Sequence, residues 1–128
     1  MEFKNLLSKG ILVKYQRSDA KGFRKYKEVL IQLAKATGLD KDILVYFTED
    51  QMSSNEISAI VIASKELKKH NQNRSIRVFA ISSVIETLQS TKVSDIENIF
   101  LYRIEKKGDE KADKTWMLKQ IEQELDEL

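Results

Sequence analysis

The feature that most constrains the fold is an apolar run within residues 42–50, which read DILVYFTED. Residues 43–47 are all apolar, and most of them are β-branched or aromatic, while charged residues stand at both ends of the stretch. A short continuous run of this kind is typical of a β-strand that is buried on both faces. The run therefore predicts a central strand of an α/β fold, with helices packed on its two sides.

Other segments alternate between strand-like and helix-like patterns. The predicted strands are 11–15, 43–48, 76–81 and 98–104, and the predicted helices are 2–8, 19–37, 55–70, 84–89 and 111–127. In the helix at 19–37, apolar residues recur at helical spacing opposite a charged face. Segment 55–70 is ambiguous, because its central ISAIVIAS also fits a strand. Candidate caps at residues 53–55, its length and its basic end favour a helix.

Strands that alternate with helices predict a mostly parallel sheet joined by right-handed crossovers. We expect a single α/β domain over residues 1–128, with a central sheet of about four strands and helices on both faces. The chain has no proline and only 4 glycines, so no linker is indicated. The alternative is an α+β fold with an antiparallel or mixed sheet.

The composition excludes several kinds of site. The chain has no cysteine and one histidine, which leaves no disulfide framework and no Cys/His zinc site. Neither the GxxxxGK[ST] nor the GxGxxG phosphate-binding motif occurs. No apolar run approaches the ~18 residues of a membrane span. We therefore expect a cytoplasmic protein that needs no cofactor and does not bind membranes, and we favour a protein without enzymatic activity.

Two acidic residues suggest a metal site. Glu49 and Asp50 follow the central strand, and ligands of open parallel sheets bind beyond the carboxyl ends of the strands. Their oxygens could hold a divalent cation, as in a metal-dependent enzyme such as a nuclease. The alternative is that both are polar loop residues at the point where the chain leaves the core.

Basic residues gather in the first third of the chain, where residues 1–36 hold nine Lys or Arg against three Asp or Glu. Such a surface can grip the phosphate backbone of RNA or DNA. The candidate nucleic-acid-binding residues are Lys14, Arg17, Lys21, Arg24, Lys25, Lys27, Lys68, Lys69 and Arg74. The alternative is a helix face whose charges only contact solvent.

The last helix, within 111–128, is amphipathic and ends in acidic residues that the helix dipole disfavours. Its apolar stripe must therefore pack on something, either its own domain, another protein or a second copy of the chain. The candidate contact residues are Trp116, Ile121, Leu125 and Leu128.

These patterns rank three functions. The first is a small binding or regulatory protein that acts through contacts with other proteins. The second is an RNA- or DNA-binding protein that uses the basic face of residues 14–27. The third is a metal-dependent enzyme built on Glu49 and Asp50.

Overall fold

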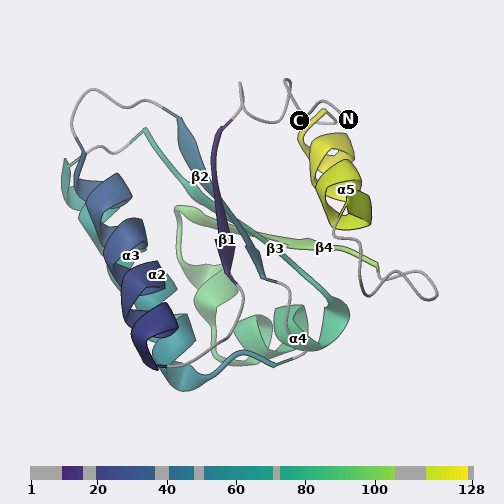
Figure 1. Cartoon of the computed structure of the whole chain (residues 1–128), viewed down its shortest axis with the longest axis horizontal. Helices are drawn as coiled ribbons and strands as arrows, with labels where there is room; N and C mark the ends of the chain where they lie inside the picture. The colour runs from purple at the N-terminus through teal and green to yellow at the C-terminus, as the bar shows by residue number, and fades with distance from the viewer. Residues whose placement is uncertain are drawn as a thin grey trace.

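A four-stranded, fully parallel sheet forms the centre of the molecule (Figure 1). The computed structural model describes residues 10–15, 20–36, 41–47, 51–70, 73–105 and 115–126; the side chains of 14–15, 20–23, 115–118 and 124–125 are outside this description. The strands are β1 (Gly10–Tyr15), β2 (Asp42–Phe47), β3 (Ile76–Ala80) and β4 (Ile99–Arg103), in the order β1-β2-β3-β4. This confirms the predicted α/β fold, and every described strand pair is parallel, unlike the α+β alternative.

Three helices cover one face of this sheet. They are α2 (Ala20–Lys35), α3 (Ser54–His70) and α4 (Ser82–Ser90), and each lies between two consecutive strands. Because every connection leads to the next strand in the same direction, right-handed crossovers place all three helices on the same side. Their apolar stripes meet the odd-numbered residues of β2 and the even-numbered residues of β3 in one large core. We call this side the helical face.

The opposite face carries a smaller core. Leu44, Tyr46 and Phe79 from the strands pack there with Ile104 and with Ile121 of the last helix, α5 (Thr115–Asp126). Figure 1 shows α5 alone on this side of the sheet. Helices therefore lie on both faces, as predicted, but in unequal number. We call this side the α5 face.

The ambiguous segment is helix α3, as its caps indicated. Ser53 and Glu56 form a capping box, in which the Ser53 N–H donates to Glu56 Oε1 at 2.6 Å and the Glu56 N–H donates to Ser53 Oγ at 3.3 Å. These two bonds satisfy backbone N–H groups at the start of the helix, which have no partner within the helix itself. Glu56 is 2% exposed whereas Ser53 is exposed, so the glutamate is the buried member of the box.

The remaining boundaries shift by a few residues. The short helix predicted at 84–89 is longer, at 82–90, while that predicted at 111–127 is described over Thr115–Asp126. A single turn of 3-10 helix, η1 (Val93–Asp95), precedes β4. The predicted helix at 2–8 lies outside the described residues. Within the part of the chain that the structure describes, no helix has the length and hydropathy needed to cross a membrane.

Candidate functional site

An ion pair lies on the α5 face at the amino-terminal end of the sheet. Arg77 of β3 donates from Nε to Asp42 Oδ2 at 2.9 Å, and the Ser75 N–H donates to Asp42 Oδ1, also at 2.9 Å. The two charged side chains are 19% and 22% exposed, so neither is fully removed from water. Such a pair at the end of a sheet face interrupts what would otherwise be an apolar surface.

Two aromatic residues of β4 surround the same arginine. Arg77 lies opposite Phe100 in the strand register, and its guanidinium carbon is 4.8 Å from the centre of the Phe100 ring. Its Nη1 donates to the Tyr102 hydroxyl, and the Tyr102 ring stacks on Phe79 with centroids 4.7 Å apart. A guanidinium over a ring face is attracted by the π-electron quadrupole. Arg77 therefore fixes both aromatic side chains against the sheet.

β4 is an edge strand, since among the described strands it pairs only with β3. The Ile76 N–H donates to the Asn98 carbonyl and the Ile104 N–H donates to the Ala80 carbonyl, each at 2.9 Å. In a parallel ladder alternate residues face the same neighbour, so the even-numbered residues of β4 face β3. The backbone groups of Leu101 and Arg103 therefore point outward, as does the carbonyl of Ile99. The Ile99 N–H instead donates to the Ile96 carbonyl at 3.2 Å.

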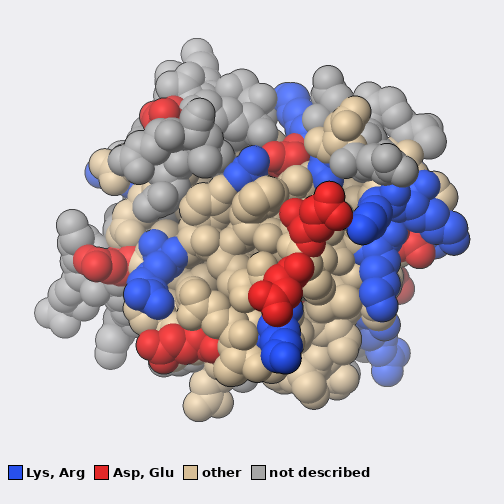
Figure 2. All heavy atoms as spheres, turned by 180° about the vertical axis from the view of Figure 1, so that it is seen from behind, with Lys and Arg blue, Asp and Glu red and all other residues tan. Residues whose placement is uncertain are grey.

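The side chains of this strand add an apolar surface to the open backbone. Phe100 is 42% exposed, more than either of the other exposed large apolar side chains described, Val29 at 37% and Ile62 at 36%. Leu101 and Tyr102 are half-buried and Arg103 is exposed. We call residues 100–103 the β4 edge patch. In Figure 1 β1 is nearest the viewer, so Figure 2 looks from behind at the β4 side, where an uncharged area lies beside acidic and basic side chains.

The last helix is attached to the domain through the residues that can be described. Ile121 is fully buried in the core of the α5 face. Gln120 forms a reciprocal pair with the backbone of Glu105, donating from Nε2 to its carbonyl at 2.5 Å and accepting its N–H at 2.8 Å. Ile121 therefore packs on its own domain and is not free for a partner, which corrects the prediction for this residue. The side chains of Trp116, Leu125 and Leu128 are outside the described part.

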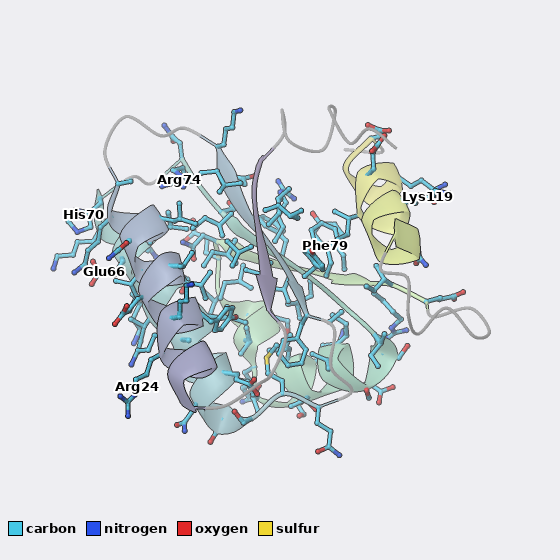
Figure 3. The ribbon with its side chains drawn as sticks, in the orientation of Figure 1. Arg24, Glu66, His70, Arg74, Phe79 and Lys119 are labelled. Atoms are coloured by element: carbon cyan, nitrogen blue, oxygen red, sulfur yellow. The ribbon has the colours of Figure 1, made fainter. Side chains whose placement is uncertain are left out.

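The predicted basic residues do not form one described surface. Arg24, Lys25 and Lys27 lie near the start of α2, whereas Lys68 and Lys69 lie near the end of α3. Both helices run antiparallel to the strands on one face, so these groups lie at opposite ends of the helical layer, as Arg24 and His70 show in Figure 3. Figure 2 shows Lys and Arg side chains along its right-hand side, and acidic side chains lie among them. Arg17 and the side chains of Lys14 and Lys21 are not described.

Arg74 is a correction, because it is fully buried. Its Nε donates to the Lys41 carbonyl at 2.7 Å and its Nη1 donates to the Leu33 carbonyl at 2.8 Å. The guanidinium thus ties the end of α2 to the start of β2, at the end of the helical layer labelled in Figure 3. A buried side chain with these bonds cannot contact nucleic acid, so Arg74 does not extend a basic face.

The proposed metal residues Glu49 and Asp50 lie outside the described residues. The structure does change the argument that suggested them. Ligands bind doubly wound sheets where the strand order reverses, and the order β1-β2-β3-β4 has no reversal. Within the described ranges, no group of three or more His, Cys, Asp or Glu side chains is arranged to hold a metal ion.

A shallow polar pocket of about 370 Å³ opens at the amino-terminal ends of β3 and β4. It is lined by Lys68, Asn73, Ser75, Glu97 and Asn98. Lys68 Nζ lies 3.3 Å from Glu97 Oε2, and these side chains are 66% and 84% exposed. Asn98 Nδ2 donates to the Ser64 carbonyl at 2.9 Å. Lys68 and Glu97 thus bind each other, and Asn98 bonds to the backbone of α3.

Comparison with protein-family models, with curated proteins and with solved structures finds no match to this chain. The site must therefore be judged on its geometry. Sequence reasoning did not select the β4 edge patch, because a strand of five residues gives no sign of lying at the edge. The only available signal was Arg77, a charged residue inside an otherwise apolar strand.

Proposed function

We propose that this chain is a small binding protein that acts through contacts with another protein chain, and that the contact surface is the β4 edge patch. One observation carries the proposal: the most exposed large apolar side chain described, Phe100, lies on an edge strand where the outward backbone groups of Leu101 and Arg103 have no partner among the described residues. Edge strands are templates for pairing with another chain, and soluble proteins usually protect them with Lys, Pro or a bulge.

The fixed position of the aromatic rings supports the same function. Arg77 holds the rings of Phe100 and Tyr102 against the sheet before any partner arrives. A partner that docks on ordered side chains loses less conformational entropy than one that must order them. Aromatic and arginine side chains are also the residues most enriched among those that dominate binding energy.

The test is site-specific photo-cross-linking in the host cell, with a photoreactive phenylalanine at position 100 and, as a matched control, at position 29. Val29 is similarly exposed but lies on α2. We expect a discrete cross-linked product from position 100 only. The captured chain, once purified, should bind the wild-type protein at least ~10-fold more tightly than Phe100→Glu, a difference of about 1.4 kcal/mol. Equal products from both positions, or equal affinities, would refute the proposal.

Nucleic-acid binding remains a second prediction, favoured by the exposed Arg24 and Lys25 on α2. Its test is fluorescence anisotropy with labelled RNA and DNA over a range of salt concentrations. Phosphate contacts release counterions, so the logarithm of the affinity should fall linearly with that of the salt concentration, and less steeply for Arg24→Gln with Lys25→Gln. No binding at low salt would exclude this function.

A further inference from the structure

We infer that the partner at the β4 edge is a second copy of this chain, whose β4 pairs antiparallel with the first across a two-fold axis. The inference rests on the proposed function, since it names the occupant of the same patch. A two-fold interface must be complementary to itself, so each donor, ring and charge needs its counterpart within the same strand. The residues of β4 meet this condition in one register.

In that register Leu101 lies opposite Leu101 of the second copy. Each Leu101 N–H then donates to the Leu101 carbonyl across the axis, as in a hydrogen-bonded antiparallel pair. Each Arg103 N–H donates to the Ile99 carbonyl of the other copy. The Ile99 N–H needs no partner, because it already donates to the Ile96 carbonyl within its own chain. The outward N–H groups of the strand are therefore all satisfied.

The side chains agree with the same register. Phe100 lies opposite Tyr102 of the second copy on the α5 face, and the symmetry produces this aromatic pair twice. These are non-hydrogen-bonded positions, where the side chains approach most closely, and cross-strand aromatic pairs stabilise antiparallel sheets. On the helical face, Leu101 meets Leu101. Apolar surface that is exposed in the single chain would thus be buried in the pair.

Charged side chains lie at both ends of the interface. Arg103 lies at the same end of the interface as Glu97 of the second copy, which stands in the turn that leads into its β4. Both residues are exposed in the single chain. Among the described residues the Glu97 carboxylate pairs with the exposed Lys68, and it can also receive the Arg103 guanidinium. Two such pairs would guide the strands into the antiparallel orientation.

Neighbouring registers fit less well. With Phe100 opposite Phe100, the Leu101 carbonyl would face the Ile99 N–H, which is already bonded to Ile96. With Tyr102 opposite Tyr102, the two Arg103 side chains would lie diagonally next to each other, and like charges repel. In the register centred on Leu101, the occupied Ile99 N–H faces the Arg103 carbonyl instead, at the exposed end of the strand, so the central Leu101 pair keeps both of its hydrogen bonds and the two Arg103 side chains lie apart.

The first experiment is sedimentation equilibrium of the full chain over a range of concentrations. We expect the mass to rise with concentration from 14.8 kDa to twice that value. Phe100→Glu should weaken the dimer at least ~10-fold, whereas Ile62→Glu, an equally apolar and exposed site on α3, should leave it unchanged. A wild-type mass that stays at 14.8 kDa overturns the dimer. If position 100 still cross-links a different protein, the proposed function survives that failure; if it cross-links nothing, both fail.

The second experiment tests the register with single cysteines. Because the chain has no cysteine of its own, any disulfide must involve the introduced one. Opposite Cα atoms of a hydrogen-bonded pair are about 5.5 Å apart, within the range of a disulfide, whereas diagonal ones lie beyond about 7 Å. Leu101→Cys should therefore form an intermolecular disulfide under mild oxidation, and Phe100→Cys should form little, with Ile62→Cys as the background. More cross-linking at 100 than at 101 overturns this register. Equal cross-linking at 62 and 101 overturns the interface itself.

Discussion

The helical face and the α5 face belong to the same four strands but are covered in different ways. On the helical face, α2, α3 and α4 are the crossovers that connect consecutive strands, so the sheet cannot form without bringing them along. On the α5 face the cover comes from a helix that follows the last strand and joins no two strands. The topology therefore requires the helices of the helical face, whereas it does not require α5.

This difference determines where a site can be. On the helical face the strand residues belong to one continuous apolar core, and the buried Glu56 and Arg74 beside it are bonded to the protein's own backbone. The α5 face has a smaller core, and the rest of it carries the Asp42–Arg77 ion pair and the ring of Phe100. A sheet of this kind can place binding groups on the face that its crossovers leave open. The predictions below test whether the two faces differ in this way.

The largest effect is expected from a cavity on the helical face. Leu30 of α2 is fully buried, so Leu30→Ala should lower the free energy of unfolding by about 2–5 kcal/mol. The neighbouring Val29 is 37% exposed, and Val29→Ala should change it by less than about 0.5 kcal/mol. Urea denaturation followed by circular dichroism measures both. Similar losses for the two variants would show that the helical face is not the main core.

A smaller and more local effect is expected on the α5 face. Ile121→Ala should cost about 2 kcal/mol, the low end for such substitutions, because the core there is small. Since α5 connects no strands, we expect its amides to lose protection from hydrogen exchange while those of β2 and β3 keep theirs. Gln123→Ala, at an exposed position of α5, is the control. A parallel loss of protection in the sheet would mean that α5 is part of one cooperative unit.

Much of the fold could be predicted from local patterns. The apolar run at 43–47 is a buried strand, and the stripe of the helix at 19–37 includes Tyr26 and Leu30, both now found in the core. The candidate caps at residues 53–55, the length and the basic end favoured a helix over a strand for segment 55–70, and the structure has helix α3 there, capped by Ser53 and Glu56. Each of these signals comes from residues close together in the sequence, so no knowledge of the tertiary structure was needed.

The candidate site could not be predicted in the same way. Which strand lies at the edge depends on the strand order, and nothing in the β4 sequence IFLYR indicates that order. Arg74 was assigned to a basic surface because arginine is usually exposed. Its partners are the carbonyls of Leu33 and Lys41, and backbone groups leave no signature in the sequence. Ile121 was a candidate for contact with a partner, but the surface that it contacts is its own domain.

A third prediction concerns the ion pair of the α5 face. A double-mutant cycle with Asp42→Asn and Arg77→Gln should give a coupling energy of about 1 kcal/mol, since the pair is mostly but not fully buried. The same cycle on Lys68 and Glu97, whose side chains are 66% and 84% exposed, should give no measurable coupling. Chemical denaturation of the single and double variants supplies both values. Equal coupling in the two pairs would contradict the view that the α5 face shelters its polar groups.

The smallest effect is a pH dependence from the same face. Burial raises the pKa of Tyr46 above its usual value of 10.0, because desolvation disfavours the phenolate. The unfolded chain therefore loses this proton at a lower pH than the folded chain does. Below pH 10 the hydroxyl is neutral in both states, and above it the free energy of unfolding should fall as the pH rises through the folded pKa. Tyr46→Phe should remove this part of the decline, which urea denaturation at neutral and alkaline pH measures. The two proteins share every other titratable group, so the difference between the two slopes reports on Tyr46. If the slopes coincide, water reaches the phenol, and the core of the α5 face is more open than its packing suggests.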